Sequence, residues 1–160
     1  MSGCETMVDI YSEPYCPRVH FSPQAGWMND PNGLVLFDGE YYLFFQFNSE
    51  EIDHPTPKHW AHAVSKDLVN WKHLPVALFL DSLGEIWSGS VVVDWENTSN
   101  FKTTEAPVMV AVFTHFDDGF QQQSIAYSND RGRTWEKYSG NPVITNPDFK
   151  DFRDPRVFWH

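Results

Sequence analysis

The stretch Leu34–Phe47, "LVLFDGEYYLFFQF", decides the fold class. Two aromatic and aliphatic runs flank Asp38-Gly39, the dipeptide that best tolerates the positive φ angles of a tight hairpin turn. Short apolar runs of strand-forming residues bounded by such a turn are typical of β-strands. The stretch therefore predicts a β-hairpin.

Similar strand-like runs recur along the chain, separated by Pro, Gly, Asn and Asp. None of them shows a convincing apolar stripe with the 3.6-residue period of a helix. We expect further strands at "HWAHAVS" (59–65), "WSGSVVVDW" (87–95), "VMVAVFTHF" (108–116) and "QQSIAYS" (122–128). The chain is therefore predicted to be all-β, with residues 1–18 as a mobile N-terminal leader and residues 19–160 as the folded part.

Two related segments, "SKDLVNW" (65–71) and "SNDRGRTW" (128–135), follow predicted strands. Asp67 and Asp130 are expected to accept backbone N–H bonds within their turns, while the closing tryptophan of each segment packs back onto the sheet. The second segment resembles the Asp-box hairpin of β-propeller blades. The separation of the two is compatible with a four-stranded blade plus loops. Two unrelated hairpin turns are the alternative.

The chain carries 11 basic and 22 acidic residues, giving a formal net charge of −11. A surface of this sign repels phosphate backbones and anionic lipid, so we expect no nucleic-acid and no membrane partner. A neutral small molecule or oligosaccharide fits the aromatic content of 16%. We predict no cofactor and no metal, because the histidines show no ligand spacing and neither CxxC nor HExxH occurs.

The opening residues show no basic segment followed by an apolar run of signal-peptide length. The sequence as read therefore predicts a cytoplasmic protein, or an extracellular one if the N-terminus is incomplete. Cys4 and Cys16 could form a disulfide, although two incidental free thiols are the commoner case.

The segment "WMNDPNG" (27–33) holds the first candidate catalytic residue, Asp30. Pro31 disfavours helical geometry at the residue before it, so we expect Asp30 to be extended. Asn32-Gly33 is expected to reverse the chain in a tight turn. The carboxylate would then sit on a stiffened strand end, as a nucleophile requires. A plain Asx turn is the alternative.

A second Asp-Pro step, "FRDP" (152–155), places Arg153 beside Asp154. The guanidinium is expected to favour the ionised carboxylate and to lower its pKa. A surface ion pair at a strand start is the alternative. Polar and aromatic residues of the kind that line sugar pockets lie between the two aspartates: Gln46, Trp60, Trp87 and Ser88. Taken singly, each could equally belong to the core, to a solvated strand face or to a bulge.

The ordered segments "WMNDPNG", "FFQF", "HWAHAVSKDLVNW", "WSGSVV" and "FRDP" resemble the motifs of glycoside hydrolase family 32, which contains invertases, exo-inulinases and levanases. The resemblance runs from about Val19 to His160. It implies an incomplete five-bladed β-propeller with about two blades present. It also implies a retaining glycosidase that hydrolyses terminal non-reducing β-D-fructofuranoside residues of sucrose, inulin or levan. A fructosyltransferase of the same family and a non-catalytic fructan-binding propeller remain as alternatives.

The resemblance also implies residue roles. Asp30 would be the nucleophile and Asp154 the transition-state stabiliser, oriented by Arg153. Trp27 and Met28 would wall the pocket around Asp30. The substrate-binding residues would be Asn29, Gln46, Trp60, Trp87, Ser88 and Arg153.

A retaining glycosidase needs a second carboxyl group about 5 Å from the nucleophile as general acid/base. In this family that group is a glutamate within a Glu-Cys motif, which does not occur in residues 1–160. We therefore expect a truncated N-terminal part of the catalytic domain that is inactive alone. His54 stands where many relatives carry a tryptophan, and "WSGS" replaces the more usual "FSGS", which leaves the preferred sugar open.

Overall fold

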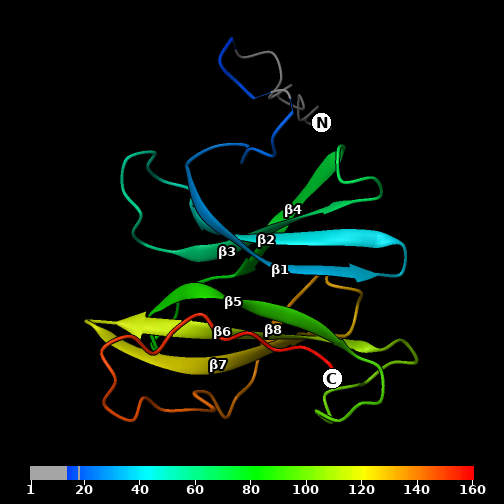
Figure 1. Cartoon of the computed structure of the whole chain (residues 1–160), viewed down its shortest axis with the longest axis vertical. Helices are drawn as coiled ribbons and strands as arrows, with labels where there is room; N and C mark the ends of the chain where they lie inside the picture. Colours follow the sequence, from blue (N-terminus) through cyan, green and yellow to red (C-terminus); the bar gives the residue numbers. More distant parts are fainter. Residues whose placement is uncertain (1–13, 18) are drawn as a thin grey trace, which may run out of the picture.

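The computed structural model describes residues 14–17 and 19–160. These residues form two four-stranded antiparallel sheets, one above the other in Figure 1. The first sheet contains β1 (Trp27–Phe37), β2 (Glu40–Asn48), β3 (His59–Ser65) and β4 (Trp71–Leu78). The second contains β5 (Glu85–Asp94), β6 (Val108–Asp117), β7 (Phe120–Ser128) and β8 (Glu136–Lys137). In this described part of the chain, no helix is long and apolar enough to cross a membrane.

Each sheet is an up-and-down meander in which every strand pairs with the next one along the chain. The predicted hairpin between β1 and β2 is confirmed, with φ angles of 51° at Asp38 and 77° at Gly39. The sequence did not predict β4, because Pro75 interrupts its pattern. Pro75 lies where the β3–β4 ladder is irregular, between the paired residues Leu74 and Leu78. The all-β prediction is confirmed, and the meander is the form of a propeller blade.

The two repeated segments form equivalent turns. Asp67 accepts the backbone N–H groups of two following residues at 2.9 and 2.7 Å, and Asp130 does so at 3.0 and 2.9 Å. Trp71 and Trp135 donate their indole N–H groups to the carbonyl three residues earlier, at 3.1 and 3.2 Å. Both rings pack back onto apolar clusters, as the sequence predicted.

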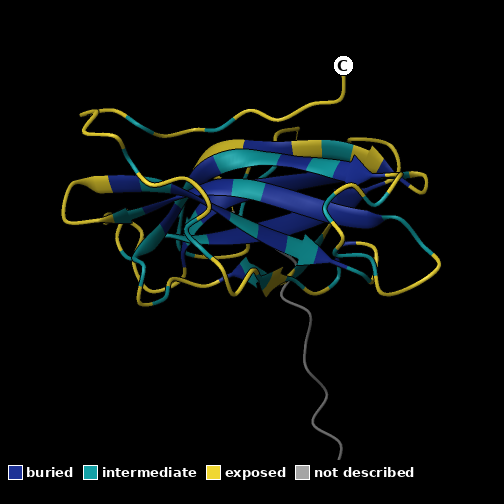
Figure 2. Cartoon of the chain, turned by 90° about the horizontal axis from the view of Figure 1, so that it is seen from below, coloured by how far each residue is buried: buried dark blue, intermediate teal, exposed yellow. Residues whose placement is uncertain are grey.

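The main core lies between the two sheets and takes side chains from strands β1 to β7. Phe44, Trp60 and Phe113 form a run of aromatic contacts across it, with ring centroids 5.6 and 5.8 Å apart. A smaller cluster around Phe45 covers the outer face of the first sheet, where Phe21 packs against it. Figure 2 shows the buried residues concentrated along the strands, with the connecting loops exposed.

Polar contacts fix the first sheet against the second. His62 donates from Nε2 to the carbonyl of Gly132 at 2.8 Å, and the Tyr42 hydroxyl donates to the carbonyl of Arg131 at 2.8 Å. Burial lowers the pKa of His62, so its ring is neutral at pH 7. These contacts join β2 and β3 to the turn between β7 and β8, while β1 packs directly against β5, where the candidate site is built.

The segment after β8 returns to the second sheet and runs along β5. Ser90 donates from Oγ to the carbonyl of Pro155 at 3.0 Å and accepts the N–H of Val157 at 2.9 Å. Trp159 donates its indole N–H to the carbonyl of Val93 at 2.7 Å. The predicted leader, residues 1–18, falls mainly outside the described residues, and so does Cys4 of the possible disulfide.

Candidate active site

Two β-bulges carry the central residues of the site. The register of β1 shifts between Asn29 and Pro31, and that of β5 shifts between Trp87 and Gly89. A bulge inserts an unpaired residue and redirects its side chain. The unpaired residues here are Asp30 and Ser88, which the packing of the two sheets brings together.

The backbone around Asp30 differs from the prediction in two respects. Its φ angle is +34°, so the residue is not extended, because the bulge overrides the preference set by Pro31. Asn32 and Gly33 do not reverse the chain but continue β1. Gly33 has a φ of +59°, and a Cβ there would lie 2.7 Å from the Phe44 ring, so this position requires glycine.

Asp30, Ser88 and Gln46 form a hydrogen-bonded triangle. Ser88 donates from Oγ to Asp30 Oδ2 at 2.9 Å, and Gln46 donates from Nε2 to the same oxygen at 3.3 Å. Gln46 also donates to Ser88 Oγ at 2.8 Å. Ser88 and Gln46 are buried, whereas Asp30 is exposed. The protein therefore fixes one carboxylate oxygen of Asp30, and among the described residues no hydrogen bond reaches Oδ1.

The second aspartate, Asp154, is held by polar side chains of β6 and β7 that the sequence analysis missed. Thr114 accepts the backbone N–H of Asp154 at 3.0 Å and donates to Gln123 at 2.9 Å. Gln123 donates to the carbonyl of Phe152 at 2.7 Å, and Gln121 accepts the N–H of the same residue at 2.7 Å. Thr114 and Gln123 lie within the predicted strands at 108–116 and 122–128, and Gln121 directly precedes the second. These polar residues were the available signal, because buried strands are mostly apolar.

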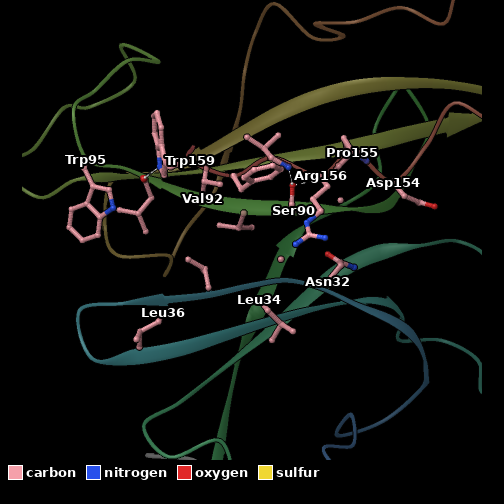
Figure 3. Close-up of a pocket in the computed structure, with 17 residues that line it drawn as sticks. Asn32, Leu34, Leu36, Ser90, Val92, Trp95, Asp154, Pro155, Arg156 and Trp159 are labelled. Carbon is pink, nitrogen blue, oxygen red and sulfur yellow. Dashed lines mark hydrogen bonds between the residues drawn. The ribbon is translucent and has the colours of Figure 1, made fainter.

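A hollow of about 130 Å³ brings the two aspartates together. Its lining consists of Asp30, Gln46, Lys58, Trp87, Arg153 and Asp154. A larger hollow of about 590 Å³ lies between β1, β5 and residues 154–159, and its lining includes Leu34, Leu36 and Val92 (Figure 3). Asp154 lines both hollows but Asp30 lines only the smaller one, which is therefore the candidate active site.

The pKa of Asp154 is shifted in the direction opposite to the prediction, although Arg153 itself acts as expected. Burial and the nearby charge of Asp30 raise the pKa of Asp154, and Arg153 opposes them only in part. The Arg153 Nε lies 3.7 Å from Asp154 Oδ2, while the other arm of the guanidinium pairs with Asp151. Arg153 therefore divides its charge between two carboxylates, and the prediction of a lowered pKa at Asp154 was wrong.

Comparison with known proteins agrees with this geometry. Residues 20–160 match the family model described as the glycosyl hydrolases family 32 N-terminal domain. The chain belongs to glycoside hydrolase family 32. It is 59% identical over 150 residues to a levanase of Bacillus subtilis, an alignment that covers 94% of this chain and 22% of the levanase.

Solved structures of family 32 members share the fold. The exo-inulinase of Aspergillus awamori superposes with a TM-score of 0.87 at 42% identity, covering 94% of this chain and 34% of the inulinase. A fructofuranosidase from Schwanniomyces occidentalis, complexed with fructose, gives 0.83 at 42% identity, covering 90% of this chain and 29% of the other. The prediction of an incomplete propeller is confirmed. This family 32 chain spans about a third or less of the length of these relatives.

Not every residue expected to bind substrate lines the hollow. Trp60 is fully buried in the core between Phe44 and Phe113, and its indole N–H donates to the carbonyl of Trp87 at 3.0 Å. It cannot contact a sugar, so that prediction was wrong, and Trp60 instead supports the neighbouring Trp87. Asn29 pairs with Gln46 across β1 and β2 at the edge of the site, without lining the hollow.

The tryptophan and methionine before Asp30 divide between the two faces of β1. Met28 packs on the outer cluster of the first sheet, away from the site. The Trp27 ring lies 6.0 Å from the Lys58 ammonium but does not line the hollow. The expectation that both wall the pocket was therefore wrong, because side chains alternate across a strand. His54 is exposed and also lies outside the lining.

The described part of the chain contains no group of three or more His, Cys, Asp or Glu side chains arranged to hold a metal ion. The polar groups of the hollow are carboxylates, an amide, an indole and two cationic side chains. Such a set can hold sugar hydroxyls by hydrogen bonds and can present a carboxylate oxygen to an electrophilic carbon.

Replacing Asp154 by Asn is expected to stabilise the fold near pH 7. The folded-state pKa is raised, so ionisation of Asp154 favours the unfolded chain, and this unfavourable contribution grows as the pH rises through the folded pKa. We expect a gain of about 0.5 kcal/mol in the free energy of unfolding, a small value because the side chain is 56% exposed and screened.

Urea unfolding of the unsubstituted 160-residue chain and of its Asp154→Asn variant, at pH 7 and at pH 3, measures this effect. The gain should disappear at the acid pH, where Asp154 is itself neutral. A variant that is less stable than the parent at pH 7 would contradict the assignment of a raised pKa.

Proposed function

We propose that this chain supplies the nucleophile side of a retaining active site for terminal non-reducing β-D-fructofuranosides. The observation that carries the proposal is the position of Asp30. One of its oxygens is held by Ser88 and Gln46, and the carboxylate shares a hollow with Asp154. Retaining glycosidases require a carboxylate fixed in this way for attack on the anomeric carbon.

The proposed reaction has two steps. Asp30 Oδ1 attacks the anomeric carbon, the bond from that carbon to the leaving oxygen breaks, and a fructosyl ester forms on Asp30. Water then attacks the same carbon and releases both fructose and the carboxylate. The leaving oxygen takes a proton from a general acid, which afterwards receives a proton from the water. No residue of this chain is assigned the role of general acid/base.

The remaining groups of the hollow bind and stabilise the sugar. Asp154 is placed to accept hydrogen bonds from sugar hydroxyls, and its negative charge favours the positive charge that develops on the ring. The Trp87 ring lines the hollow and stacks on Phe116 with centroids 4.0 Å apart, so it forms a fixed aromatic wall beside the sugar. Fructose bound in a structural neighbour supports this class of ligand.

A hybrid protein tests the proposal, with this chain replacing the matched 150-residue part of the Bacillus subtilis levanase. We expect the hybrid to release fructose from levan, inulin or sucrose, with the β-anomer appearing first in a proton NMR time course. We expect the 160-residue chain alone to release none above a buffer blank, because it lacks the Glu-Cys motif.

Two controls make the result decisive. The parent levanase shows that the assay works, and circular dichroism shows that the hybrid is folded. A folded hybrid that binds fructose without cleaving fructosides would identify a binding module and contradict the proposal. Release of the α-anomer first would contradict the retaining mechanism.

A further inference from the structure

Lys58 lies immediately before β3 and lines the hollow together with Asp30 and Asp154. Its carbonyl accepts the backbone N–H of Ile86 at 3.1 Å, so its main chain is tied to β5 of the other sheet. Its side chain is only 12% exposed. Lys58 is thus a fixed part of the site, although no motif in the sequence singled it out.

The ammonium group of Lys58 is held by Glu85 and Trp87. Its Nζ lies 3.5 Å from Glu85 Oε2 and 4.8 Å from the centroid of the Trp87 ring. The same Glu85 oxygen accepts the Trp87 indole N–H at 2.9 Å. The carboxylate and the aromatic face both attract the ammonium group and fix its position at the hollow.

The hydrogen-bonding capacity of this ammonium is largely unused. An ammonium carries three N–H donors, yet among the described residues Nζ makes no hydrogen bond, and its contact with Glu85 is an ion-pair distance. These donors remain free to bond water or a ligand in the hollow that Lys58 lines. Sugar hydroxyl oxygens entering the hollow are acceptors of the kind that this group lacks.

We propose that Lys58 is a further substrate-binding residue, whose ammonium donates a hydrogen bond to a hydroxyl of the fructosyl unit bound in the hollow. This inference rests on the proposed function and adds a residue to the same site. Because Lys58 binds a hydroxyl and does not touch the bond that breaks, its loss weakens substrate binding more than it slows the chemical step.

The test compares Lys58→Met with Lys58→Arg in the hybrid protein. Methionine keeps the length and apolar stem of the side chain but removes every donor. We expect Lys58→Met to raise KM about tenfold while kcat stays within about threefold, as for loss of one charge-assisted hydrogen bond. Lys58→Arg should keep KM within about threefold. The matched control is Lys72→Met on the exposed side of β4, which should change neither constant.

The possible outcomes test the role of Lys58 separately from the proposed function of the chain. If the unsubstituted hybrid is active and the KM of its Lys58→Met variant is within twofold of the hybrid's own, the role of Lys58 alone is overturned. If the parent hybrid binds fructose without turnover, the dissociation constant from isothermal titration replaces KM, with the same expected tenfold change. If the unsubstituted hybrid neither binds nor cleaves fructosides, both the role of Lys58 and the proposed function are overturned. If Lys58→Met fails to fold, Lys58→Gln is measured instead, and an unchanged KM in that variant overturns the proposal.

Discussion

Asp30→Asn in the hybrid protein is expected to lower kcat for sucrose, inulin and levan by about 10⁴-fold, while fructose binding stays within about tenfold. The amide cannot form the fructosyl ester, so the covalent step is lost. Asparagine can still accept the Ser88 hydroxyl and adopt the φ of +34° found at this position, so the shape of the hollow is kept. Initial-rate kinetics and isothermal titration with fructose measure the two quantities separately.

Asp118→Asn is the matched control for this prediction. Asp118 lies in the exposed turn between β6 and β7 and has a φ of 43°, so the same chemical change is made at a similar backbone angle away from the hollow. Its kcat should equal that of the parent. A kcat of Asp30→Asn within tenfold of the parent would remove the nucleophile assignment. Loss of both turnover and fructose binding would indicate a structural role for Asp30 instead.

Trp60→Ala is expected to reduce the free energy of unfolding by about 3–5 kcal/mol. Trp60 is fully buried, so the substitution leaves a cavity between Phe44 and Phe113 and removes the hydrogen bond to the Trp87 carbonyl. Urea denaturation of the 160-residue chain, followed by circular dichroism, measures the loss. Since domain stabilities are about 5–15 kcal/mol, a variant already unfolded without urea also agrees with the expectation.

Trp95→Ala provides the comparison, because Trp95 is 60% exposed and should cost about 1 kcal/mol or less. A loss below 1 kcal/mol for Trp60→Ala would contradict the core position of Trp60. Trp60→Phe separates stability from binding. It should retain fructose affinity once folded, whereas a residue that contacts the sugar would lose affinity with little change in stability.

Local sequence patterns were sufficient for most of the fold. The turn at Asp38-Gly39 and the two related turns closing on Trp71 and Trp135 depend on residues close in sequence, and the structure contains them as predicted. The strand β4 was missed because Pro75 interrupts it, and an interrupted strand is stabilised by its partner β3, which the sequence of β4 does not reveal.

The candidate site was only partly accessible from the sequence. Asp30 and Asp154 were identified from their motifs and from the family resemblance, and the structure places them in one hollow. The pKa direction at Asp154 was wrong, because sequence adjacency to Arg153 revealed neither the partial desolvation of the carboxyl group nor the neighbouring charge of Asp30. Lys58 carries no motif and was not recognised.

The sequence by itself determined an all-β chain of family 32 with its turns and its two aspartates, because these follow from local propensities and from short motifs. The tertiary structure decided which side chains meet. Ser88 and Asp30, separated by 58 positions, bond at 2.9 Å only because bulges in two different sheets direct them to the same point. Two similar tryptophans, Trp60 and Trp87, divide between core and hollow for the same reason: burial depends on how the sheets pack, which no local pattern contains.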